Sequence, residues 1–219
     1  MKTLKSIFSL VCAIVLLLAG QVYGQKKGSS VILPPQKGNN AYEQAVKLTG
    51  EGWKTAMYNI EEQLASTWKL MSEADGNVNR YIWAEYESAA ESLEKAKMEN
   101  YMQCIDILSY QVQLPFMSQC RLIMIQKNIG GEQQIAEMEK TVNYITPIVI
   151  QNNSLKSMEF YKEMDKNFIV QTVYLVDKTN IYDELLKECV KFVGNYKDAA
   201  TYTEIFKEAH DRMAKQSLR

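Results

Sequence analysis

Apolar residues recur at helical spacing along most of the chain. Ile60, Leu64, Trp68 and Met71 lie four, four and three residues apart, and Asn59 directly before them is a good N-cap residue. We therefore predict a helix that begins after Asn59. The same spacing predicts a short helix over 41–49, a long helix from about Ser88 to Val112, its continuation over 120–129, and helices over 135–147, 181–193 and 198–215.

Prolines and glycines indicate where these helices end. Pro115 lies inside the long apolar stripe, and we expect it to kink or interrupt the helix because proline lacks an N–H and clashes with the preceding turn. Gly130 and Gly131 predict a helix–helix turn, and the next stripe stops near Pro147. On the long helix we expect apolar residues, Met98 among them, on one face and Glu and Lys on the other.

Three segments have the composition of β-strands. Residues 80–87 are rich in aromatic side chains, while 155–161 and 168–176 are β-prone runs joined by a polar hairpin loop over 163–167. A strand that stands apart from a hairpin usually joins it in one sheet. We therefore predict an α+β fold in which a small antiparallel sheet of about three strands is covered on one face by long helices.

The N-terminus has the pattern of an export signal. Residues 1–24 combine two lysines, an apolar run and a small residue before Gln25, and the apolar run is shorter than the ~20 residues of a membrane span. We expect this signal peptide to be cleaved, which leaves no transmembrane span. Residues 25–40 then predict a flexible linker, 41–195 the α+β domain, and 196–219 a C-terminal helix that packs back or projects.

Charge and composition limit which functions the chain can have. The net charge of −1 becomes −3 when residues 1–24 are removed, so nothing favours nucleic acid as a partner. The chain has one histidine, His210, which we interpret as a surface residue near a helix C-terminus. The run that begins at Asp75 resembles the start of a calcium loop but lacks its glycine and its final glutamate. We expect no metal, no cofactor and no catalytic residue.

Three cysteines, Cys104, Cys120 and Cys189, remain after residues 1–24. An odd number leaves at least one thiol outside any disulfide, and we interpret all three as small apolar core residues.

Aromatic residues supply the candidate binding site. Three tryptophans and thirteen tyrosines are many for this length, and aromatic side chains carry much of the energy of protein interfaces. The predicted binding residues are Trp68, Tyr81, Trp83 and Tyr86. The alternative is that the tryptophans build the core where the N-terminal helix meets the sheet.

The strand–helix run over 81–97 and the hairpin strand that ends at Asp177, with the lead-in Gly52-Trp53 and Gln63-Leu64, resemble a family. The chain is similar to uncharacterised secreted proteins of Bacteroidetes-type bacteria and, more remotely, to twenty-kilodalton surface-lipoprotein antigens. The resemblance implies association with the cell envelope and supplies no catalytic residue. The chain departs from the pattern at Glu85, where glycine is expected, and lacks a lipid-bearing cysteine after residue 24.

We therefore expect an exported, non-enzymatic protein of the periplasm, outer membrane or extracellular space that binds another envelope protein or itself. One alternative is a secreted hydrolase that uses acidic residues such as Glu85 and Glu87, which would share a strand face, or Glu91 and Glu94. Another is a protein that holds a small apolar ligand between helices and sheet. A carboxylate pair enclosed in a pocket would favour the hydrolase, and an exposed aromatic patch would favour the binding protein.

Overall fold

The computed structural model describes residues 40–56, 58–75 and 78–217. The predicted signal peptide (1–24) and all of the predicted linker except Asn40 lie outside the described residues. Within them the chain folds as six helices, a three-stranded antiparallel sheet and a two-stranded hairpin, so the predicted α+β class is confirmed.

Two helices open the described chain. Helix α2 (Ala41–Gly50) begins after its N-cap Asn40, and helix α3 (Ile60–Ser72) begins after its N-cap Asn59, whose side chain accepts a hydrogen bond of 2.7 Å from the Glu62 N–H. Both helices were predicted, the second from the capping side chain of Asn59 before its apolar stripe. The short strands β1 (Ala74–Asp75) and β2 (Val78–Asn79) pair with each other after α3.

The main sheet has the order β3-β5-β4, with every pair antiparallel. Strand β3 (Tyr81–Ala90) pairs with β5 (Asn167–Asp177), which also pairs with β4 (Leu155–Met164). The hairpin turn between β4 and β5 is only two residues, Asp165 and Lys166, and Asp165 takes a positive φ of 58°. The loop predicted over 163–167 is therefore shorter than expected, because both strands continue into it.

The long helix starts later than predicted. Residues 88–90 continue strand β3 and pair with Val170, Ile169 and Phe168, so the predicted start at Ser88 is wrong. Helix α4 (Leu93–Lys127) begins after Ser92, whose hydroxyl accepts a hydrogen bond from the Lys95 N–H. The alanines after Ser88 favour a helix by propensity, but pairing with a central strand outweighs that preference.

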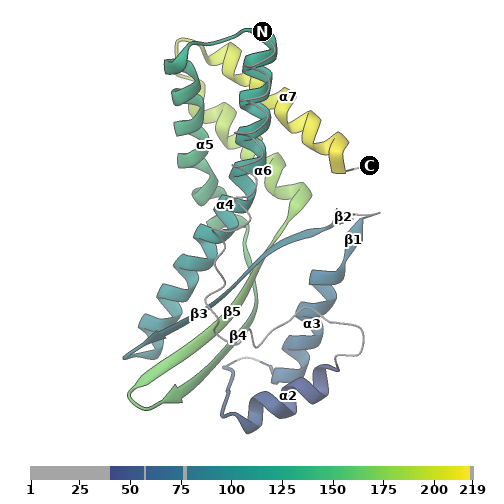
Figure 1. The fold of residues 1–219 in the computed structure, drawn as a ribbon, viewed down its shortest axis with the longest axis vertical. Helices are drawn as coiled ribbons and strands as arrows, with labels where there is room; N and C mark the ends of the chain where they lie inside the picture. Colours follow the sequence, from purple (N-terminus) through teal and green to yellow (C-terminus); the bar gives the residue numbers. More distant parts are fainter. Residues whose placement is uncertain (1–39, 57, 76–77, 218–219) are drawn as a thin grey trace, which may run out of the picture. The chain divides into compact units, whose positions relative to one another are not determined.

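Neither internal proline ends its helix. Helix α4 runs through Pro115, so of the predicted kink or interruption there is no interruption; helix α5 (Glu132–Asn153) runs six residues beyond Pro147, so the helix end predicted there is wrong. Figure 1 shows α4 changing direction along its length, as expected of a proline-containing helix. Val112, one turn before Pro115, and Phe116, directly after it, are fully buried, so both sides of the missing hydrogen bond are packed in the core.

Helices cover both faces of the sheet, whereas the sequence predicted cover on one face. The N-terminal half of α4 lies on the face that carries Ala84 and Val170, and the Asn100 amide there donates to the Tyr86 and Val170 carbonyls at 2.7 and 3.0 Å. Helix α3 contacts the other face, where the Thr67 hydroxyl bonds to Ser157. Residues 170–173 of β5 are consequently all buried, as in a strand covered on both sides.

The remaining helices extend the core away from the sheet. Helices α6 (Lys178–Val193) and α7 (Ala199–Ser217) pack with α5 and the C-terminal half of α4. Phe116 of α4 stacks against Phe206 of α7 and Tyr182 of α6, with ring centroids 6.1 and 6.4 Å apart. The C-terminal helix thus packs back on the molecule, and Figure 1 shows α7 crossing α4 and α6.

Candidate functional site

The four aromatic residues predicted to bind a partner do not gather on one surface. Trp68 is only 6% exposed and lies in the core beside the sheet. Tyr86 points to the α4 face of β3 and packs against the core. Tyr81 and Trp83 lie on the opposite face by strand alternation and are half-buried, with the Arg80 guanidinium 5.3 Å from the Tyr81 ring centre. A binding role for the four stays a prediction.

The acidic pairs considered for catalysis are not enclosed. Glu85 is half-buried and accepts a 2.6 Å hydrogen bond from the Gln171 amide, whereas Glu87 on the same strand face is exposed. Glu91 precedes α4 and forms an ion pair with Lys95, which holds the pKa of Glu91 below its usual range. Glu94 is exposed on the first turn of α4.

The other ionisable candidates have structural contacts. His210 on α7 lies 2.6 Å from the Asp183 carboxylate on α6, so it links these two helices. The three thiols are buried and unpaired with each other, and burial raises the pKa of Cys104 to about 12 and of Cys189 to about 12. In the part of the chain that the structure describes, no three His, Cys, Asp or Glu side chains lie close enough to hold a metal ion.

Helix α4 presents an exposed row opposite its buried side. Every fourth residue from Ala96 to Met124 is buried, and the row shifted by two positions is exposed throughout. Two positions correspond to about 200° of rotation, so the exposed row lies on the far side of the helix. We call this the α4 row; it consists of Met98, Met102, Asp106, Tyr110, Leu114, Ser118, Leu122 and Gln126.

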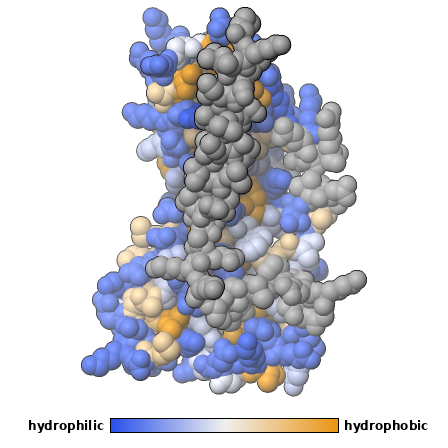
Figure 2. All heavy atoms as spheres, viewed as in Figure 1, coloured by the Kyte–Doolittle hydropathy of each residue, from blue (hydrophilic) through white to orange (hydrophobic). Residues whose placement is uncertain are grey.

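The α4 row is unusually apolar for a solvent-facing surface. Met98 is 60% exposed, Met102 57% and Leu122 42%, and Ile125 beside the row is 65% exposed. The only charged member is Asp106. On the coloured part of the face in Figure 2, hydrophobic residues form small groups between hydrophilic ones. A line of large apolar side chains along one helix is typical of an interaction surface.

Sequence reasoning missed this row and placed Met98 on the buried stripe. The buried stripe of α4 contains every fourth residue from Ala96 to Met124, together with Ile105, Ser109 and Ile123, and steps of four make it wind around the helix axis as the helix passes from the sheet to α5 and α7. The prediction assumed a straight stripe with alternating steps of three and four residues, and such a stripe leaves the buried positions as they wind around the helix. The signal was present in the sequence as apolar residues at 98, 102, 110, 114 and 122, four or eight residues apart.

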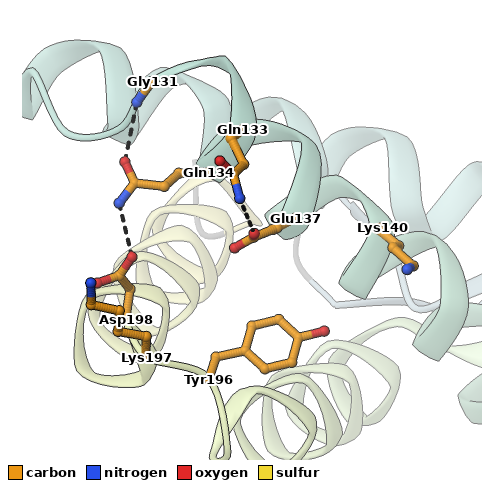
Figure 3. Close-up of a pocket in the computed structure, with 8 residues that line it drawn as sticks. All are labelled: Gly131, Gln133, Gln134, Glu137, Lys140, Tyr196, Lys197 and Asp198. Atoms are coloured by element: carbon orange, nitrogen blue, oxygen red, sulfur yellow. Dashed lines mark hydrogen bonds between the residues drawn. The ribbon is translucent and has the colours of Figure 1, made fainter.

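A hollow of about 690 Å³ lies between the first half of α5 and the connection from α6 to α7. Gln133, Glu137 and Lys140 reach it from one face of α5, because they are spaced four and three residues apart. Tyr196, Lys197 and Asp198 reach it from the connection, and Figure 3 shows the Tyr196 ring lying opposite α5.

Hydrogen bonds fix the polar groups of this hollow. The Glu137 carboxylate accepts from the Gln133 amide at 3.1 Å and from the Tyr202 hydroxyl at 2.8 Å. Burial, followed by the bond to Glu137, raises the pKa of Tyr202, so the hydroxyl stays protonated and remains a donor. The Gln134 amide donates to Asp198 at 3.0 Å, and its oxygen accepts from the Gly131 N–H at the start of α5.

Comparisons with known proteins give no relative for this chain: no family model, no curated protein and no solved structure matches it. Among the described residues, no helix is both long enough and apolar enough to span a membrane.

Proposed function

We propose that this chain is an exported, non-enzymatic envelope protein that associates with a second copy of itself through the α4 row. The observation that carries the proposal is the line of exposed methionine and leucine side chains on the far side of a helix whose near side is fully packed. Burying such side chains contributes about 25 cal/mol per Å² of apolar surface, which favours covering the row.

The geometry of the row favours a helix as the occupant. Residues four apart form a ridge, and ridges of this kind pack into the grooves between the same ridges of another helix, at a crossing angle of about −50°. Methionine and leucine adapt well to such a contact.

Charge favours a second copy in antiparallel orientation. Turning one row about the point between Tyr110 and Leu114 places Asp106 opposite Ser118, whose hydroxyl can donate to it, and Met102 opposite Leu122. A parallel arrangement would place Asp106 opposite Asp106. A two-fold symmetric dimer therefore pairs Met102 with Leu122 and Tyr110 with Leu114, gives the only charge of the row a hydrogen-bond donor, and places Met98 opposite Gln126 at its ends.

The remaining features support export and binding without catalysis. Residues 1–24 have the charge and apolar pattern of a cleaved signal. The acidic pairs are exposed or held by Gln171 and Lys95 instead of converging in a closed pocket, the arrangement that acid–base catalysis would need.

Sedimentation equilibrium of the exported chain, from Gln25 onward, tests the proposal. We expect a mass twice that of one chain at concentrations of about 1 to 200 µM. Leu114→Glu and Leu122→Glu should each weaken the dimer at least about tenfold by placing a charge in an apolar contact.

Leu155→Glu is the matched control, because Leu155 is a leucine on β4, outside the row, that is more exposed than Leu114 and Leu122. It should leave the dimer unchanged. A monomer throughout this range, or equal loss with Leu155→Glu, would show that the α4 row is not a self-association surface.

A further inference from the structure

The hollow between α5 and the α6–α7 connection has the size of a small-molecule site. Its volume of about 690 Å³ lies within the ~300–1,000 Å³ typical of ligand pockets. None of its lining residues belongs to the α4 row, so what it binds is independent of self-association.

The charges in the hollow balance. Two carboxylates, Glu137 and Asp198, stand beside two ammonium groups, Lys140 and Lys197. Among the described residues neither lysine forms an ion pair, and both are exposed. A lining with no net charge gives a strongly anionic or cationic ligand no electrostatic advantage. The hollow therefore favours a neutral molecule.

Hydrogen bonds hold the polar groups of the hollow in place, but part of their hydrogen-bonding capacity remains free. A carboxylate has about four lone-pair sites, and Glu137 uses two of them for Gln133 and Tyr202 while Asp198 uses one for Gln134. The remaining lone pairs accept hydrogen bonds, and the two lysines donate them. Hydroxyl groups suit this lining because each both donates and accepts.

An aromatic ring completes the lining. Tyr196 is held edge-to-face by Phe192 and by Tyr202, with ring centroids 5.9 and 6.1 Å away. Figure 3 shows its ring between Lys197 and Asp198 on one side and Lys140 on the other. A fixed aromatic surface beside fixed acceptors matches a pyranose ring, which has an apolar C–H face and a rim of hydroxyls.

We propose that this hollow binds a neutral saccharide, with one sugar ring on Tyr196 and hydroxyls bonded to Glu137, Asp198 and Lys140. An amino acid or peptide end is the competing class, because it would use the carboxylates and ammonium groups as ion-pair partners.

Calorimetric titration of the exported chain tests the assignment. Maltotriose, cellotriose, xylotriose and chitotriose are the neutral probes, and triglycine is the zwitterionic one. We expect at least one trisaccharide to bind with a Kd of about 10 µM to 1 mM, with little dependence on salt because no ion pair forms. Tyr196→Ala should weaken it at least about tenfold and Lys140→Ala about threefold.

Two controls separate the site from the fold. Tyr42→Ala and Lys47→Ala change an exposed tyrosine and an exposed lysine on α2 and should leave binding unchanged. If Tyr196→Ala loses the native circular dichroism spectrum, the exposed Lys140→Ala carries the test. Salt-dependent binding of triglycine alone, binding of no probe, or binding that survives Lys140→Ala and a folded Tyr196→Ala would overturn the proposal.

Discussion

Among the ion-paired carboxylates of the described residues, Glu159 is the most buried. It is 9% exposed and lies 2.7 Å from both Lys97 on α4 and Lys156 on β4. Burial alone would raise the pKa of Glu159, but the hydrogen bonds and charges of Lys156 and Lys97 outweigh it and lower that pKa. The Glu159 carboxylate therefore links the edge strand β4 to helix α4 by an ion pair.

Glu159→Gln should lower the free energy of unfolding at pH 7 by about 1–2 kcal/mol, because two charged partners lose their anion. A pKa lowered in the folded state means that the stabilisation is complete above the ordinary carboxyl range and is lost as pH falls through the native pKa. Urea unfolding measures the free energy of unfolding of both proteins at pH 7 and pH 3. The difference between Glu159→Gln and wild type should be smaller at pH 3.

Glu94→Gln is the control, because Glu94 is an exposed residue on the first turn of the same helix. A penalty for Glu159→Gln that stays constant from pH 7 to pH 3 would argue against the ion pairs.

The thiols should be inert in the native protein. Cys104, Cys120 and Cys189 are fully buried, and burial raises the pKa of each, so little thiolate forms and reagents have no access. Ellman's reagent at pH 8 should modify none of them in the chain from Gln25 onward. It should modify all three in guanidinium chloride. Rapid modification of one thiol without denaturant would contradict the burial.

At the scale of elements, Asn100 is a buried polar side chain that joins α4 to two strands of the sheet. Asn100 is fully buried, and its amide reaches carbonyls of both β3 and β5. We expect Asn100→Ala to lower the free energy of unfolding by about 2–3 kcal/mol, because it removes two buried hydrogen bonds and leaves a cavity. Chemical denaturation measures this, and Gln103→Ala on the exposed side of α4 should cost less than about 0.5 kcal/mol.

The elements show what local sequence can and cannot predict. Caps such as Asn59 and the β-prone hairpin residues act over a few neighbours, and their elements were predicted correctly. The end of β3 was not predicted correctly, because Ala89 and Ala90 become strand only by pairing with residues nearly eighty positions later. Pro115 and Pro147 stay inside helices because tertiary packing exceeds the cost of a missing hydrogen bond.

The two candidate surfaces, the α4 row and the hollow, also depend on contacts between residues far apart in the sequence. The α4 row depends on which side of the helix its neighbours bury, and that side winds around α4 as the neighbours change from sheet to helices. The hollow joins residues of α5 to Tyr196, about sixty positions away, so no local pattern indicates it. Trp68, by contrast, faces the core, as its place on the apolar stripe with Leu64 and Met71 indicated.

For the whole molecule, α4 connects two packed regions. Its first half covers the sheet, and its second half packs with α5, α6 and α7 around Phe116 and Phe206. The three tryptophans, at 53, 68 and 83, all lie outside these four helices. Tryptophan fluorescence therefore reports on the sheet end, while far-UV circular dichroism reports mainly on the helices.

If α4 makes the two regions one cooperative unit, a cavity among the helices should destabilise the sheet as well. Phe206→Ala removes a fully buried ring and should cost about 3–5 kcal/mol. The denaturation midpoints measured by tryptophan fluorescence and by far-UV circular dichroism should both move to lower denaturant concentration by the same amount, because neither half of α4 can unfold without the other. Tyr42→Ala, which truncates a ring that is 58% exposed on α2, should move neither midpoint. A fluorescence midpoint that stays in place while the dichroism midpoint falls would show that the sheet end unfolds on its own.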